Sequence, residues 1–133
     1  MSTFHLQIVT PDRMVYDGQA ERIIMRTVCG DVCILARHID YAAPLGVGEA
    51  TVVFEDGSAR FAAASGGMLS VSAGEVRVMA TTFEWEDEID LERAQHAQES
   101  AAQRLAQLER NDAGYAVVEA KLKRALNRIQ VKG

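Results

Sequence analysis

The hydrophobic pattern of this chain changes its period once, near Glu84, and this change constrains the fold more than any single motif. Before it, apolar and polar residues alternate, as they do over residues 4–8 and as a half-buried β-strand requires. After it, apolar residues recur at steps of three and four, as on one face of an α-helix. The sequence therefore predicts an α+β protein with a strand-rich part over residues 1–84 and a helical part over residues 85–133.

Short strand-like runs fill the first part, and turn signals separate them. Strands are expected at residues 4–8, 21–28, 32–35, 50–54, 59–64, 68–72 and 75–82. Turns are expected at Asp17-Gly18, Asp56-Gly57 and Ser65-Gly66-Gly67, because glycine permits backbone angles that other residues avoid. This pattern predicts a two-layered antiparallel β-sandwich, or flattened barrel, since a single sheet would leave its apolar face in water.

Two amphipathic segments follow the strands. Their apolar faces consist of Leu91, Ala94, Ala97, Ala101, Leu105 and Leu108, and then of Tyr115, Val118, Leu122, Ala125 and Ile129. Asp90 is placed to cap the first helix, and Asn111 or Asp112 the second. Because the link between them is short and polar, an antiparallel helical hairpin is expected. Half of the first face is alanine, which buries little apolar surface, so the hairpin is a candidate for large movements.

Composition and charge exclude several classes of protein. The chain has no run of about 18 apolar residues and no basic N-terminal start followed by a small-residue cleavage site, which predicts a soluble cytoplasmic protein. Its net charge of −5 disfavours nucleic-acid binding. The C-terminal segment is nevertheless basic, which indicates either an acidic partner surface or a solvated helix face. The basic residues there are Lys121, Lys123, Arg124, Arg128 and Lys132.

No catalytic or metal-binding set is recognisable. A phosphate-binding loop and a Gly-x-Ser-x-Gly elbow are both missing, and no histidine is placed as a base for Ser65. Cys29 and Cys33 are interpreted as reduced thiols, because the three histidines are too scattered to complete a zinc site with them. The sequence predicts that the chain is not an enzyme on its own and needs no cofactor.

Three arginines form the most informative constellation. Arg124 and Arg128 are four residues apart on one helix, and an antiparallel hairpin brings Arg93 near them. Three guanidinium groups near a helix N-terminus suit a polyphosphate. The alternative is that they pair with Asp90, with Glu92 and with solvent, and the spacing leaves both interpretations open.

Five segments together resemble the epsilon subunits of bacterial F-type ATP synthases. They are Thr10-Pro11-Asp12-Arg13 through Gly18, the stretch from Asp31 to Leu45, Ser65-Gly66-Gly67 through Val71, Ile89-Asp90-Leu91-Glu92-Arg93-Ala94, and Lys123-Arg124-Ala125-Leu126-Asn127-Arg128-Ile129. The fourth is similar to the Ile/Leu-Asp-x-x-Arg-Ala motif of that family. The resemblance runs from Phe4 to Val131, in order and with matching spacing.

The resemblance implies a non-catalytic rotor subunit that couples ion-driven rotation to ATP synthesis. Its sandwich would dock on the gamma subunit and the c-ring, through Asp31, Arg37, His38 and Asp40. Its hairpin would extend and inhibit ATP hydrolysis, meeting the acidic tips of the β subunits in the alpha/beta catalytic ring through Lys121, Lys123, Arg124 and Arg128. The complex would hold the chain at the cytoplasmic face of the cell membrane as a peripheral protein.

ATP is implied as a possible regulatory ligand of the folded hairpin. Carried over by motif, the ATP-binding residues are Glu84, Ile89, Asp90, Arg93, Ala94, Arg124 and Arg128.

The chain departs from the family in two places. The usual Leu-Pro-Gly-His-x-Pro segment reads Leu35-Ala36-Arg37-His38-Ile39-Asp40, and Ser100 stands where ATP-binding members often carry a basic residue. A rival hypothesis is a stand-alone ligand-binding sandwich with a helical dimerisation tail, which predicts a stable homo-oligomer.

Overall fold

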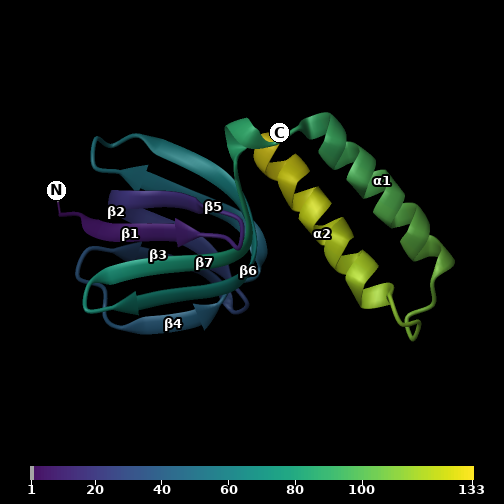
Figure 1. Ribbon diagram of the computed structural model, residues 1–133, viewed down its shortest axis with the longest axis horizontal. Coiled ribbons are helices and arrows are strands. Elements are labelled where there is room, and N and C mark those ends of the chain that lie inside the picture. The colour runs from purple at the N-terminus through teal and green to yellow at the C-terminus, as the bar shows by residue number, and fades with distance from the viewer. Residues whose placement is uncertain (1) are drawn as a thin grey trace. The chain divides into compact units, whose positions relative to one another are not determined.

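The computed structural model describes residues 2–133 and consists of two compact units, Met1–Trp85 and Glu86–Gly133. The first unit contains the strands and the second contains the helices (Figure 1). The boundary lies one residue beyond the position expected from the change in hydrophobic period. Neither described helix combines the length and the apolar character that crossing a lipid bilayer requires.

The strands of the first unit close into a ring. They are β1 (Phe4–Val9), β2 (Met14–Thr27), β3 (Gly30–Leu35), β4 (Tyr41–Pro44), β5 (Val47–Phe54), β6 (Ala59–Ser72) and β7 (Glu75–Trp85). Neighbouring strands follow the order β1-β7-β6-β5-β2-β3, β4 pairs with β6, and β1 also pairs with β2. Because β1 pairs with both β7 and β2, the five strands β1, β7, β6, β5 and β2 form a closed circuit. The remaining two are edge strands, β3 beside β2 and β4 beside β6. The predicted α+β fold with an N-terminal sandwich is confirmed.

One strand pair is an exception to the antiparallel pattern. β1 and β7 are parallel, with Leu6 opposite Val76 and Ile8 opposite Val78. A parallel pair needs a long connection, and here the rest of the sandwich provides it, because β1 is the first strand and β7 the last. Single-sequence periodicity contains no information about such a pairing.

The predicted turn at Ser65-Gly66-Gly67 is wrong, because these residues lie inside β6. Gly66 and Gly67 have φ values of 68° and 97°, which bend the strand without ending it. Before the bend β6 pairs with β5, and after it with β4. A Cβ atom on Gly67 would lie 1.8 Å from the carbonyl oxygen of Met79 on β7. Glycine is therefore required here for a bend and a close approach between strands.

One further expectation for the strands was wrong, and one strand was not predicted. Asp17-Gly18 is not a turn but part of β2, where Gly18 pairs with Leu6. Its missing side chain leaves room for Tyr16, whose hydroxyl lies 2.8 Å from the position of a Cβ on Gly18 and donates to the Gln19 carbonyl. The short strand β4 was missed, because it has only four residues and ends in Pro44, which a marginal strand tolerates.

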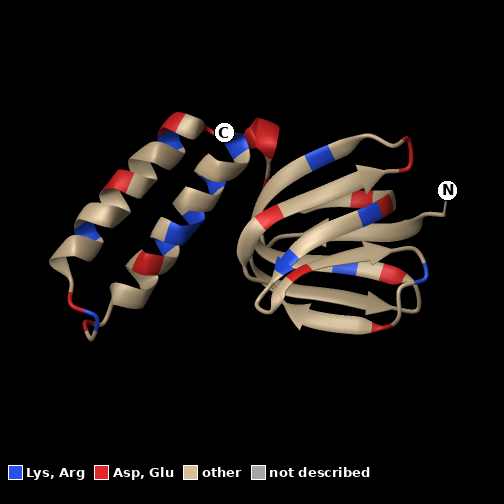
Figure 2. Ribbon diagram, turned by 180° about the vertical axis from the view of Figure 1, so that it is seen from behind, with Lys and Arg blue, Asp and Glu red and all other residues tan. Residues whose placement is uncertain are grey.

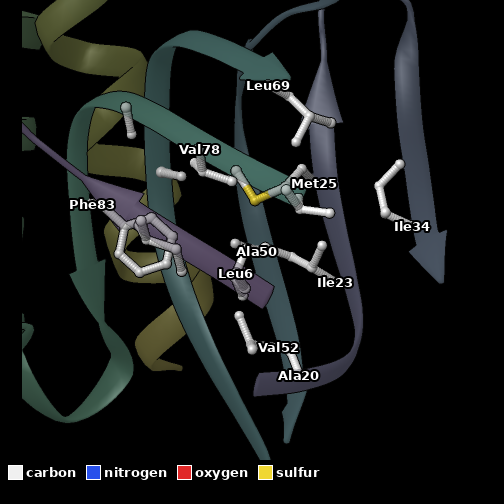
Figure 3. Packing of buried hydrophobic residues seen from close by; sticks show 14 of the residues in the cluster. Leu6, Ala20, Ile23, Met25, Ile34, Ala50, Val52, Leu69, Val78 and Phe83 are labelled. Carbon is white, nitrogen blue, oxygen red and sulfur yellow. The ribbon is translucent and has the colours of Figure 1, made fainter. Parts of the chain in front are cut away.

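The core of the sandwich consists of large aliphatic side chains. Leu6, Ile8, Ile23, Ile34 and Leu69 are completely inaccessible to solvent. Figure 3 shows side chains from several strands pointing into this common interior. Burial on this scale is the main stabilising contribution to a unit of this size.

The second unit is an antiparallel helical hairpin, as predicted. A short 3₁₀ turn, η1 (Glu86–Glu88), precedes α1 (Leu91–Gln107) and α2 (Tyr115–Lys132), which lie side by side in Figure 1. Asp90 caps α1 as predicted, since its carboxylate accepts a hydrogen bond from the Arg93 amide at 3.1 Å. The predicted cap of α2 is wrong: α2 starts after Gly114, and Asp112 instead accepts from the Glu109 amide at 2.8 Å.

The seam between the helices is built from small residues. The buried positions are Ala94 and Ala101 on α1 and Val118, Ala125 and Val131 on α2. At the open end of the hairpin, the Lys132 ammonium donates to the Glu86 carbonyl oxygen at 3.1 Å. The helices therefore bury little apolar surface per residue.

Candidate functional site

A basic groove runs between α1 and α2. It has a volume of about 310 Å³ and is lined by Ala97, Ser100, Ala101, Arg104, Val118, Lys121, Arg124 and Arg128. Small alanine and valine side chains leave space between the helices, and four long cationic side chains line the same groove. Figure 2 shows Lys and Arg gathered along α2. A site of this kind can bind a multiply charged anion.

The groove brings together some of the predicted ATP-binding residues. Arg124 and Arg128 line it as expected, since a spacing of four places them on one helix face. Arg93 is exposed and is not among the residues that line the groove, and the expected convergence of three arginines stays a prediction. Arg93 lies at the start of α1, about one turn before Ala97, which lines the groove.

The remaining residues of the motif have local roles at the start of α1. Ile89 and Ala94 are buried at 4% and 1% exposure, and Asp90 is the N-cap. Glu84 is half-buried on β7 in the other unit. In this structure the motif shapes the beginning of the hairpin.

Arg104 is a groove residue that sequence reasoning missed. It lies one turn after Ser100, the position where a basic residue was expected and is lacking. The signal that can find it is the i, i+4 spacing, which places both side chains on the same face of α1. Lys123, in contrast, lies outside the groove lining and pairs with Glu119 at 3.8 Å.

The predicted docking residues of the sandwich lie at the β2–β3 hairpin and in the loop after β3. Asp31 forms a bidentate pair with Arg26, with the closer contact, from Nε to Oδ1, at 2.5 Å. The hydrogen bond with Asp31 raises the pKa of Arg26 above its ordinary value. This pair joins β2 to the edge strand β3 and holds a negative and a positive charge at the surface.

The loop after β3 keeps its shape without the proline and glycine of the family pattern. Arg37 adopts φ 64°, the left-handed conformation that glycine would favour. Asp40 accepts a hydrogen bond from the Ala73 amide at 3.0 Å, which ties the loop to the turn between β6 and β7. His38 contacts the ring of Tyr41 edge-on, with centroids 5.8 Å apart. Hydrogen bonding and ring packing thus hold the loop.

Two exposed apolar side chains flank the same loop. Leu35 is 53% exposed and Ile39 78% exposed. Sequence periodicity missed this feature, since Leu35 simply continues an apolar strand. Exposed apolar groups beside charged Arg37 are typical of a protein contact surface.

Cys29 and Cys33 are both exposed and form no disulfide. Among residues 2–133 no group of three His, Cys, Asp or Glu side chains is arranged to hold a metal ion.

Comparison with known proteins assigns both units. The family described as "ATP synthase, Delta/Epsilon chain, beta-sandwich domain" matches residues 3–86, and "ATP synthase, Delta/Epsilon chain, long alpha-helix domain" matches residues 87–133. The chain belongs to the ATP synthase delta/epsilon chain family. The resemblance inferred from the sequence is confirmed, and family membership favours a subunit of ATP synthase over a stand-alone ligand-binding module.

Curated relatives extend over the whole chain. The ATP synthase epsilon chain of Halalkalibacterium halodurans is 38% identical over 133 residues, covering 100% of this chain and 99% of that protein. The epsilon chain of Caldanaerobacter subterraneus subsp. tengcongensis is also 38% identical, covering 97% and 93%. The chain is thus an epsilon-type, non-catalytic subunit of ATP synthase.

Solved structures share the fold at lower sequence identity. A chain in the Euglena gracilis mitochondrial ATP synthase, described as OSCP/F1/c-ring, has a TM-score of 0.81 at 23% identity, covering 96% of this chain and 79% of that one. A chain of the Tetrahymena thermophila mitochondrial central stalk and c-ring has a TM-score of 0.64 at 14% identity, covering 97% and 96%. At these identities the likeness concerns the fold alone.

Proposed function

We propose that this chain is a rotor subunit in the central stalk of a bacterial F-type ATP synthase, with the sandwich as its anchor and the hairpin as a mobile regulatory arm. The observation that carries the proposal is the difference in packing between the two units. Large aliphatic side chains are fully buried in the sandwich, whereas three of the five buried residues in α1 and α2 are alanine. A firmly packed unit transmits torque without deforming, and a thinly packed one opens at lower free-energy cost.

The sandwich docks on the gamma subunit and the c-ring through the loop after β3 and the β2–β3 hairpin. Exposed Leu35 and Ile39 supply apolar contact area. Arg37 and the Arg26–Asp31 pair supply charges of both signs, which fix the orientation of a partner more than they add affinity. Through this docking the chain is held at the cytoplasmic face of the cell membrane.

The hairpin opposes ATP hydrolysis when it extends toward the catalytic ring. Its C-terminal helix carries Lys121, Lys123 and Arg124 within one turn, and Arg128 one turn later. The only acidic residue of α2 is Glu119, which pairs with Lys123. Such a basic surface fits an acidic segment of the β subunits.

Removal of the hairpin tests this function. A chain ending at Asp87 keeps the complete sandwich and lacks both helices. When it replaces the full chain in the assembled enzyme, ATP hydrolysis is expected to rise several-fold while ATP synthase assembly is retained. Equal hydrolysis with the full and the shortened chain would overturn the inhibitory role.

A pull-down with the gamma subunit separates anchoring from inhibition. The full chain and the shortened chain should both bind gamma, whereas Ile39→Asp should bind more weakly, because it places a charge in the apolar contact. Loss of gamma binding on removal of the helices alone would show that the sandwich is not the anchor. A stable homo-oligomer without affinity for gamma would instead support the dimerisation-tail hypothesis.

A second proposal is that ATP binds the folded hairpin as a regulatory ligand. It is supported by the groove, which Arg124 and Arg128 line together with the small residues Ala97 and Ala101. Calorimetry on the whole chain, compared with Arg124→Ala, tests it. Heat of binding for the original chain and at least tenfold weaker binding for the variant are expected. No heat up to millimolar ATP would end this proposal.

A further inference from the structure

The cationic side chains of the groove extend beyond the two arginines of the motif. Lys121, Arg124 and Arg128 stand at i, i+3 and i+7 on α2, and Arg104 faces them from α1. At about 1.5 Å per residue, the cations of α2 are spread over roughly 10 Å along the helix axis. A single phosphate would meet only part of this row, whereas a chain of phosphates could contact all of it.

The groove lining carries no carboxylate of its own. None of its lining residues is acidic. Within residues 2–133, Arg104, Lys121 and Arg124 make no ion pair, and Glu119 of α2 is occupied by Lys123. The charges of Arg104, Lys121 and Arg124 are therefore available to an anion from solution.

Like charges on facing helices also make the empty groove unfavourable. Arg104, Arg124 and Arg128 each carry a positive charge. Lys121 adds a fourth charge. A bound polyanion would replace this repulsion by charge-assisted hydrogen bonds to both helices at once.

We propose that Arg104 and Lys121 bind phosphate oxygens of a polyphosphate chain, either of a nucleoside triphosphate or of free inorganic polyphosphate. The proposal builds on the nucleotide-binding function proposed above. It assigns to Arg104 the phosphate contact for which a basic residue was expected at the position of Ser100. Because the two residues lie on different helices, the anion binds the folded hairpin and favours it over any state in which α1 and α2 separate.

The test is calorimetry on the full chain with three probes: ATP, inorganic tripolyphosphate and adenosine. Arg104→Gln and Lys121→Gln remove one charge each and should weaken binding of ATP and tripolyphosphate about tenfold or more, and reduce the salt dependence of both. Arg104→Lys keeps the charge and should retain part of the affinity. Arg110→Gln is the matched control, because Arg110 is an exposed residue of the interhelical link outside the groove. Circular dichroism would verify that each variant keeps its helices.

The outcomes separate this inference from the nucleotide proposal. If ATP binds and Arg104→Gln and Lys121→Gln match the control, the inference is wrong and the nucleotide proposal stands. If tripolyphosphate binds through these two residues and ATP does not, the inference stands and the nucleotide proposal fails. No binding of either anion would overturn both.

Discussion

The sandwich and the hairpin both bury apolar side chains, but the buried side chains differ in size. In the sandwich, Leu6 and Ile23 are completely inaccessible, and the aromatic residues Phe83 and Trp85 are nearly so. In the hairpin, Ala101 and Ala125 occupy the equivalent inner positions. The number of buried residues thus says less about local stability than their size, since hydrophobic stabilisation scales with the apolar area removed from water.

This difference suggests how one chain can combine a fixed part with a movable one. The fixed part needs a free energy of opening close to that of global unfolding, and the movable part needs a smaller one. The predictions below test this comparison.

The largest expected effect is on the bend of β6. Gly67→Ala would place a Cβ 1.8 Å from the Met79 carbonyl oxygen at a φ of 97°. Because the neighbouring atom is backbone, relief requires β6 and β7 to separate, and we expect a loss of about 4 kcal/mol or more in the free energy of unfolding. Urea denaturation followed by the fluorescence of Trp85 measures it, since Trp85 is the only tryptophan and is buried in the sandwich.

Gly57→Ala is the control for backbone conformation alone. Gly57 has a φ of 86°, but a Cβ there would have no neighbour within 4 Å. Its cost should be about 1–2 kcal/mol, from the left-handed conformation. If Gly67→Ala costs no more than this, steric contact does not fix the bend, and the sandwich is less rigid than inferred.

The next prediction compares one buried residue from each unit. Leu6→Ala should destabilise the sandwich by about 3 kcal/mol, because it leaves a cavity among large neighbours. Val118→Ala should cost the hairpin only about 1.5 kcal/mol, for the loss of two buried carbon atoms.

Hydrogen exchange resolves the two units separately. Val118→Ala should speed exchange in α1 and α2 and leave the unfolding midpoint reported by Trp85 unchanged. If the original chain protects its hairpin amides as strongly as those of β6, with or without nucleotide, the contrast between anchor and arm is refuted.

The N-cap of α1 offers a smaller change that acts on the hairpin alone. Asp90→Ala removes the acceptor of the Arg93 amide and should destabilise α1 by about 1 kcal/mol. The far-ultraviolet circular dichroism of the chain without ligand should then lose helical signal at a lower temperature. Asp90→Asn should behave almost like the original residue, because asparagine is an equally good cap. Equal losses for both variants would assign the effect to charge instead.

The fold class was predictable because two periods of hydrophobicity are local properties. Asp90 could be identified as a cap for the same reason, since a capping carboxylate acts within three residues. The partners of β1 could not be found in this way. They lie about 12 and 70 residues away, and only the three-dimensional closure of the ring decides them.

The site was predictable to the extent that it depends on one helix. Arg124 and Arg128 share a face by spacing alone, but Arg104 joins them only through the register between two helices, which the loop length does not determine. Glycine was the least informative signal. Gly57 lies in a turn, whereas Gly18 and Gly67 lie inside strands where a neighbouring group approaches closely.

The smallest expected effect is a dependence of sandwich stability on pH. His5 of β1 contacts Asp17 of β2 through Nε2 and Glu75 of β7 through Nδ1, the latter at 2.6 Å. The hydrogen bond with Asp17, and then that with Glu75, raises the pKa of His5 above 6.5. The hydrogen bond with His5 lowers the pKa of Asp17. Protonated His5 on β1 therefore links this strand to both β2 and β7.

The sign of the effect follows from these directions. Because the pKa of His5 is raised in the folded state, its contribution to the free energy of unfolding is complete below pH 6.5. This contribution is lost as the pH rises through the pKa of His5 in the folded protein. The contribution of Asp17 is present above its unfolded pKa of about 4 and is lost on acidification. The cluster stabilises most between these limits, in weakly acidic solution.

His5→Gln isolates this contribution. The urea midpoint of the original chain, minus that of the variant, should be positive at pH 5–6 and fall toward zero by about pH 9, and added salt should diminish it because the groups are exposed. The exchange rates of α1 and α2, corrected for intrinsic pH dependence, should be the same in both proteins. A difference in midpoint that stays constant with pH would mean that His5 acts by packing alone. A parallel change in hairpin exchange would show that the two units are more strongly coupled than their separate cores imply.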